Sequence, residues 1–113
     1  MNLLRLRVAH GLLWGLAITF FLSSSSSARA DDSASLYKAK CAACHGPDGA
    51  GTAVGTKLGA HDLRSADVQK MSDAELTEII TNGKNKMPAY AKTLKPDDVK
   101  GLVAFIRSLA AKK

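Results

Sequence analysis

The sequence predicts an all-α protein. Two segments, residues 72–83 and 96–110, carry apolar side chains at helical spacing and have helix start and stop signals at their ends. No segment shows the apolar–polar alternation of a half-buried strand, and the 113 residues contain no repeat or sign of a second domain. We therefore expect one helical domain behind an N-terminal leader.

Residues 1–30 have the three parts of a secretory signal peptide. Two arginines precede a twelve-residue apolar run at 11–22, and the tripeptide A-R-A at 28–30 has the small-residue pattern of a cleavage site. The run is shorter than the about 20 apolar residues of a membrane span, and an uncleaved anchor is the alternative. We expect cleavage before Asp31, which would leave residues 31–113 in the periplasm or otherwise exported, without stable membrane insertion.

The composition of the mature domain predicts a need for a cofactor. Cleavage would remove three arginines and no acid, so 16 basic residues fall to 13 against 10 acidic ones, and the formal net charge falls from +6 to +3. The remaining 83 residues keep only three large aromatic rings. The hydrophobic core of a domain of this size gives only marginal stability, so such domains usually carry a disulfide, a metal or a cofactor.

The lysines are scattered singly along the sequence, so no nucleic-acid binding is expected. We expect a monomer.

The first two segments of the mature domain are expected to be a helix and a loop. Residues 33–44 have helix-forming composition, with four residues spaced to share one side. Residues 46–61 hold five glycines. Because glycine weakens helices and strands alike, this stretch is expected to be a loop without regular structure.

The last two segments are expected to be helices with clear boundaries. Ser72 and Glu75 have the spacing of a capping box, Met71 stands at the position of a hydrophobic staple, and Gly83 marks the end. The final helix is expected to start at Pro96, whose fixed φ suits a first turn, and the two aspartates that follow suit the helix dipole.

The candidate site is C-x-x-C-H, formed by Cys41, Cys44 and His45, which would share one face of a helix. A structural zinc site would need two more ligands, and only His61 is of the right type. A redox dithiol is typical of a βαβ pattern, which is absent, and a disulfide over so short a loop would stabilise little. In an exported chain the motif favours one haem c, attached covalently through Cys41 and Cys44, with His45 as an iron ligand.

A six-coordinate haem iron needs a second axial ligand, for which the mature chain offers Met71, Met87 and His61. Met71 already serves the expected staple, and a loop histidine such as His61 is usually solvated. Pro88 keeps Met87 out of helical φ and ψ, so Met87 stands in an extended loop that can direct its thioether inward. Met87 is therefore the expected metal ligand beside His45. Ordinary core packing of Met87 is the alternative.

The stretches "LYKAKCAACHGPDG", "KMPAY" and "VAFIRSL" resemble those of small soluble bacterial class I c-type cytochromes, over nearly all of residues 33–111. The resemblance implies the class I cytochrome c fold, with three to five helices wrapped round one covalent haem. It also implies that Tyr37 is the aromatic residue before the first haem cysteine. In addition, Leu102 and Phe105 would pack the last helix across the first.

Three positions depart from that family pattern. Ser33 stands where family members often have the glycine of the helix crossing, and Gly101 is expected to supply the close approach instead. The family stretch Gly-Pro-x-Leu, whose proline carbonyl orients the haem histidine, is expected to correspond to residues 55–58, with the Thr56 carbonyl as acceptor. No tryptophan is left to contact a propionate, and the candidate replacements are Lys57, Arg64 and Lys84.

The expected function is one-electron transfer rather than catalysis, because a His45/Met87-ligated iron has no open position for a substrate. Expected partners are redox proteins: a membrane oxidoreductase, a terminal oxidase or another periplasmic redox protein. Four lysines near Met87 in the sequence could surround its face and speed the encounter with such a partner: Lys84, Lys86, Lys92 and Lys95. The alternative is a ligand-binding or peroxidatic haem protein in which Met87 is displaceable.

Overall fold

A computed structural model describes residues 26–112, so most of the expected signal peptide lies outside the described residues. The helices within that part are α1 (Ser26–Lys40), α2 (Ala42–His45), α3 (Ala53–Lys57), α4 (Ala66–Gln69), α5 (Asp73–Asn82) and α6 (Pro96–Leu109), followed by a 3-10 turn at Ala110–Lys112. The all-α class is confirmed, but these six helices exceed the three to five expected. None of the described helices has the length and apolar character needed to cross a bilayer. α1 runs through the expected cleavage point at Asp31.

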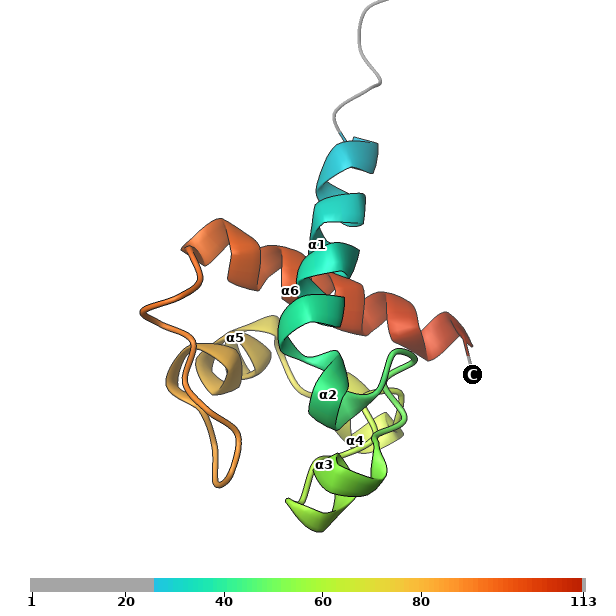
Figure 1. The fold of residues 1–113 in the computed structure, drawn as a ribbon. Coiled ribbons are helices and arrows are strands. Elements are labelled where there is room, and N and C mark those ends of the chain that lie inside the picture. Colours follow the sequence, from blue (N-terminus) through green and yellow to red (C-terminus); the bar gives the residue numbers. More distant parts are fainter. Residues whose placement is uncertain (1–25, 113) are drawn as a thin grey trace, which may run out of the picture.

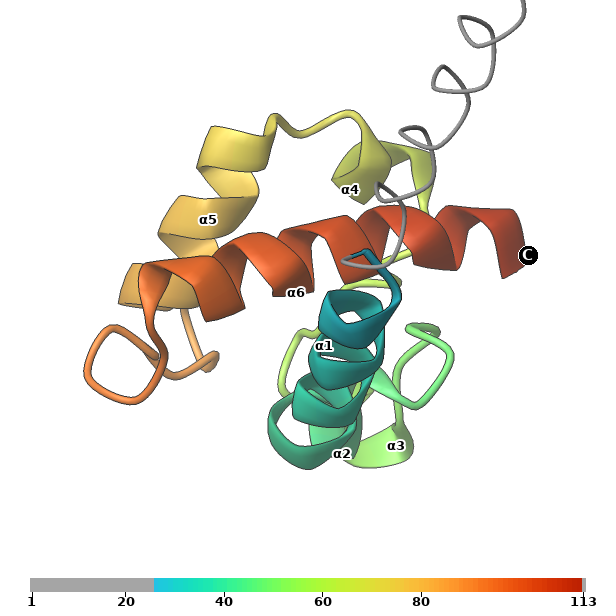
Figure 2. The same cartoon turned by 90° about the horizontal axis from the view of Figure 1, so that it is seen from above.

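The central element is α6, against which α1 packs on one side and α5 on another. In Figure 1 α1 crosses α6 near its middle, and in Figure 2 α6 separates α1 and α3 from α4 and α5. Five buried residues of α6 form the middle of the core: Val99, Leu102, Val103, Ile106 and Leu109. The other buried apolar side chains come from α1, α4, α5 and two loops, namely Tyr37, Leu63, Val68, Leu76, Ile80 and Leu94.

Both late helices begin as their sequences predict. The Ser72 backbone N–H donates to the Glu75 carboxylate at 2.7 Å, and the Glu75 N–H donates to the Ser72 hydroxyl at 3.1 Å, which completes the capping box of α5. Gly83 ends α5 at φ +76°. Pro96 opens α6, where the Lys95 N–H donates to the Asp98 carboxylate at 2.9 Å. These bonds satisfy N–H groups that a helix start would otherwise leave unpaired.

The expectation of an irregular loop at residues 46–61 is wrong, because the stretch contains α3. Thr52 caps this helix with its hydroxyl, which accepts from the Gly55 N–H at 3.0 Å. Ser65 likewise caps α4 by accepting from the Val68 N–H at 3.3 Å. These two short capped helices account for the larger number of elements.

Gly101 faces Ser33 where α1 crosses α6, in agreement with the expectation that this glycine supplies the close approach. A methyl group on Gly101 would overlap the Ser33 hydroxyl oxygen, while the Ser33 Cβ would remain 3.4 Å away. The glycine therefore allows the two helices to approach closely. Its cost is about 1 kcal/mol of helix propensity relative to alanine.

A double-mutant cycle tests this crossing. Gly101→Ala alone is expected to destabilise the protein by about 1 kcal/mol, because the overlap with the Ser33 hydroxyl outweighs the gain in helix propensity. In a Ser33→Ala background the same change should become stabilising, since only an ordinary contact remains. Urea unfolding of the four proteins measures the coupling. Additive effects of the two substitutions would contradict this account of the crossing.

Candidate functional site

The C-x-x-C-H motif lies where α1 ends and α2 begins. The Cys41 N–H donates to the Tyr37 carbonyl at 2.8 Å and so closes α1, while the His45 N–H donates to the Cys41 carbonyl at 2.9 Å. The continuous helix expected over residues 33–44 is therefore broken at Cys41, which has φ −118° and ψ −33°. The three motif residues still occupy one helical turn.

The surroundings of Cys41 do not suit a redox dithiol. Cys41 and Cys44 are free thiols and partly buried. Burial raises the pKa of the Cys41 thiol to about 11. Thiol–disulfide enzymes need the opposite, a lowered thiol pKa that supplies thiolate near neutral pH.

His45 is half-buried, and burial lowers the pKa of its imidazole. A nearby backbone group of His61 opposes this shift, and the charge of the His61 side chain adds to it. The ring is thus held neutral at neutral pH, which is the form that binds metals. Its Nδ1 is buried without a hydrogen-bond partner among the described residues.

A backbone group of His61 lies near the His45 ring. The Thr56 carbonyl accepts from the Gly59 N–H at 3.1 Å. That bond closes the end of α3 and leaves the second lone pair of the Thr56 carbonyl available. His45 Nδ1 has no hydrogen-bond partner among the described residues, so the orienting role expected of the Thr56 carbonyl stays a prediction.

The loop that follows His45 is tied down from two directions. The buried Tyr37 hydroxyl donates to the Gly46 carbonyl at 2.7 Å, and the Gly51 N–H donates to the His45 carbonyl at 2.7 Å. The Thr52 hydroxyl donates to the Ala43 carbonyl at 2.9 Å, which attaches α3 to α2. The backbone on either side of His45 is therefore fixed by bonds from α1 and from the start of α3.

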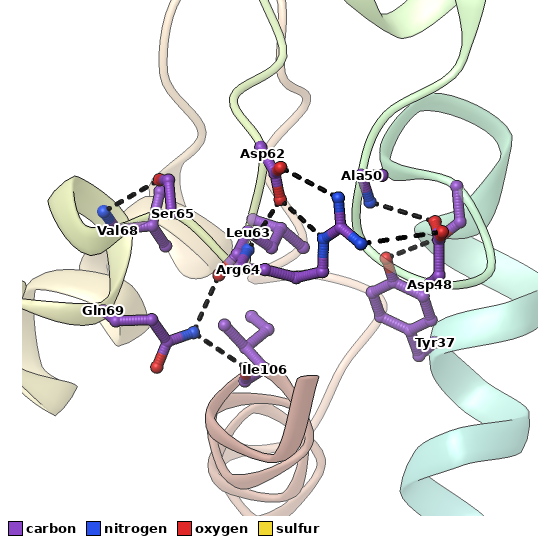
Figure 3. A network of polar contacts seen from close by, with 11 residues as sticks. Tyr37, Asp48, Ala50, Asp62, Leu63, Arg64, Ser65, Val68, Gln69 and Ile106 are labelled. Atoms are coloured by element: carbon purple, nitrogen blue, oxygen red, sulfur yellow. Dashed lines mark hydrogen bonds and ion pairs between the residues drawn. The ribbon is translucent and has the colours of Figure 1, made fainter. Parts of the chain in front are cut away.

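Arg64 belongs to a polar network with Asp62 and Asp48 (Figure 3). Its guanidinium donates to both carboxylate oxygens of Asp62 at 3.0 and 3.1 Å and lies 4.0 Å from the Asp48 carboxylate. Of the three expected propionate partners, Arg64 is thus paired with acids, while Lys57 and Lys84 are exposed.

Met87 stands in a loop of residues 83–95, named here the Met87 loop, which joins α5 to α6. The Met87 N–H donates to the Lys84 carbonyl at 2.9 Å and the Lys84 N–H to the Met87 carbonyl at 3.2 Å, which closes a tight turn. Asn85 adopts φ +54° in this turn. Met87 is extended, as Pro88 predicts, and its half-buried side chain packs against the core.

The other two ligand candidates have different surroundings. Met71 is half-buried and packs against the core, and it lines an open cavity of about 410 Å³ beside α5 together with Ile79 and Lys84. The His61 side chain is exposed, as expected of a loop histidine.

The residues around the motif fit a haem. Two free thiols lie three residues apart, the neighbouring imidazole is neutral, and its buried Nδ1 is unpaired. Two large apolar side chains, Val54 in α3 and Leu58 directly after it, are 62% and 45% exposed, and α3 packs against α2. Exposed apolar surface beside two thiols suits a large apolar ring that is bound through thioether bonds.

Two contributions to the site were missed by the sequence analysis. Thr52 could have been found, because a threonine before a short run of helix formers is a cap signal. Tyr90 donates its hydroxyl to the Lys40 carbonyl, at 3.0 Å, across 50 residues of sequence. No local pattern signals a bond over that separation.

Comparison with known proteins gives the same family throughout. Residues 28–106 match the family model described as "Cytochrome C oxidase, cbb3-type, subunit III". Cytochrome c6 of Nostoc sp. (strain PCC 7120) is 35% identical over 102 residues, which cover 84% of this chain and 86% of that protein. The cbb3-type oxidase subunit CcoP of Rubrivivax gelatinosus is 40% identical over 101 residues, or 80% of this chain but only 31% of that larger subunit.

A solved structure agrees with these sequence relatives. The KustC0563 c-type cytochrome superposes with a TM-score of 0.65 and 37% identity, over 68% of this chain and 95% of that one. The two cysteines of the C-x-x-C-H motif have the spacing of haem c attachment. The chain therefore belongs to the c-type cytochromes, in the family of the cbb3-type oxidase subunit III, and its cofactor is haem c.

Proposed function

We propose that this protein is an exported one-electron carrier whose haem iron is ligated by His45 and Met87. The observation that carries the proposal is the way the Met87 loop is held. The turn at Met87 is closed by two backbone hydrogen bonds, and Tyr90 bonds the same loop to α1 directly before Cys41. These bonds connect the Met87 loop to the helix that leads into the haem motif, which supports Met87 as the second ligand.

The proposed ligand pair favours electron transfer. Haem supplies one-electron chemistry when bound, and methionine opposite histidine raises its reduction potential. The chain's own part is to keep a neutral imidazole on one side and a thioether on the other, which leaves no position open for a substrate. The chain's cytochrome c6 and CcoP relatives support this class of function.

The charge around the Met87 loop suits an acidic redox partner. Lys84, Lys86 and Lys92 are exposed in the loop, and Lys95 is exposed at its end. Lysines around a redox site mainly accelerate encounter with a partner of opposite charge, and their effect falls with ionic strength. A membrane oxidoreductase, a terminal oxidase or a further exported redox protein would meet this requirement. We propose that the carrier acts as a monomer.

Intact-mass and optical measurements on exported protein test the proposal. The mass in denaturing acid should equal that of residues 31–113 plus one haem, because thioether bonds survive unfolding and the signal peptide is removed. The spectrum should show a pyridine haemochrome of the c type and a weak Met–iron band towards the red. Loss of haem in acid–acetone would contradict covalent attachment, and rapid binding of carbon monoxide to the reduced wild type would favour the ligand-binding alternative.

A further inference from the structure

Tyr90 connects the Met87 loop to the haem-attachment end of α1. Its hydroxyl donates to the Lys40 carbonyl at 3.0 Å, and its ring is partly buried against the core. Burial and the neighbouring charges of Cys41 and Cys44 raise the pKa of the Tyr90 phenol. The Tyr90 hydroxyl thus reaches the residue directly before Cys41.

The acceptor of this bond is a helix-terminal carbonyl. α1 ends at Lys40, and the helix is interrupted at Cys41 before α2 begins. The Cys44 N–H, which would reach Lys40 in an unbroken helix, donates instead to the Cys41 carbonyl at 3.2 Å. Such terminal carbonyls need an outside partner, and the Tyr90 hydroxyl provides it.

The remaining hydrogen bonds of the Met87 loop, among the described residues, stay within the loop or on its flanking helices. The Tyr90 N–H donates to the Ile80 carbonyl at 3.1 Å and the Ala91 N–H to the Thr81 carbonyl at 3.0 Å, both at the end of α5. These bonds hold residues 90 and 91 of the loop against the end of α5, but they do not connect the loop to α1. The hydroxyl of Tyr90 makes that connection.

We infer that Tyr90 is a positioning residue that latches the Met87 loop onto α1 and so limits how often Met87 leaves the iron. The inference rests on the proposed His45/Met87 ligation. On this inference, Met87 leaves the iron when the loop moves away from α1, and this movement breaks the bond between Tyr90 and Lys40. One bond of this kind shifts an opening equilibrium by roughly three- to tenfold.

Imidazole binding to the purified ferric holoprotein tests the latch. Imidazole binds only when Met87 has left, so its rate and affinity report opening of the loop. Tyr90→Phe removes the hydroxyl alone and should increase both by roughly three- to tenfold. It should also reduce the protection of the Tyr90 and Ala91 positions against amide hydrogen exchange. The matched control is Thr93→Val, because the Thr93 hydroxyl bonds within the same loop, to the Tyr90 carbonyl at 3.4 Å. It should leave imidazole binding unchanged within about twofold.

Each other outcome overturns the inference in a distinguishable way. Equal acceleration by Tyr90→Phe and Thr93→Val would mean general loosening of the loop rather than a latch. Unchanged binding in Tyr90→Phe, with the Met–iron band present in the wild type, would reject the latch and leave the proposed function standing. Absence of that band from the wild type would reject the Met87 ligation, and the latch with it.

Discussion

Replacing Gly55 with alanine is expected to lower the free energy of unfolding by about 3 kcal/mol or more. A Cβ at Gly55 would overlap the backbone carbonyl of Cys44, at the closest contact between α3 and α2. A backbone atom cannot rotate away as a side chain can, so α3 must move off the turn that carries Cys44 and His45. Gly55 is also inside a helix, where alanine ordinarily gains about 1 kcal/mol over glycine. The expected sign is therefore opposite to the one that helix propensity predicts.

Gly59→Ala is the matched control for this prediction. Gly59 has φ +84° but nothing within 4 Å of an added Cβ, so the substitution introduces backbone strain without a clash. It should cost about 1 to 2 kcal/mol. Urea unfolding of the two variants and the wild type provides the comparison. Similar small losses in both variants would show that α3 can move away from α2 at little cost.

The two late helices were predictable because their signals are local. The bonds between Ser72 and Glu75 span three residues, and Pro96 and Gly83 act through their own backbone conformations. Hydrophobic periodicity likewise identified the buried face of α6, including Leu102. Such features depend on residues that are close in sequence, so they can be predicted without knowing the tertiary structure.

The glycine-rich stretch was mispredicted because its glycines serve tertiary contacts. Gly55 is required by the approach of Cys44, and Gly49 lies against Leu109 and Leu63, where a Cβ would be 2.8 and 3.3 Å from their carbon atoms. A high number of glycines in a stretch is normally taken to indicate a flexible loop, so these tertiary roles are not visible in the sequence. The short helix α3 forms despite Gly55 because Thr52 caps it.

The candidate site shows the same division. The spacing of Cys41, Cys44 and His45 is local, and so is the turn at Met87. Two further features depend on segments that meet only in the folded chain. A backbone group of His61 lies near the His45 ring, and the Tyr90 hydroxyl reaches Lys40. Sequence alone suggested neither of these contacts.

Replacing Met87 is expected to have the largest effect on the haem. Met87→Ala should open the sixth position, abolish the low-spin spectrum and let carbon monoxide bind the reduced protein readily. Met87→His should keep six ligands but lower the reduction potential by on the order of 0.1 V, because a nitrogen donor favours ferric iron and axial ligands tune haem over roughly 0.8 V. Optical spectra and potentiometric titration of the purified variants measure both effects.

The matched controls are the other two ligand candidates, which leave the Met87 loop intact. Met71→Ala should cost about 1 kcal/mol of packing, since Met71 is half-buried in front of the α5 cap, and should leave the spectrum unchanged. His61→Ala should also preserve the low-spin spectrum, because the His61 side chain is exposed and its backbone, which lies beside His45, is retained. If either control abolishes the low-spin spectrum while Met87→Ala does not, Met87 is not the ligand. Met71, His61 and Met87 are the methionine and histidine candidates of residues 31–113 other than His45, so the three substitutions test every ligand of these two types.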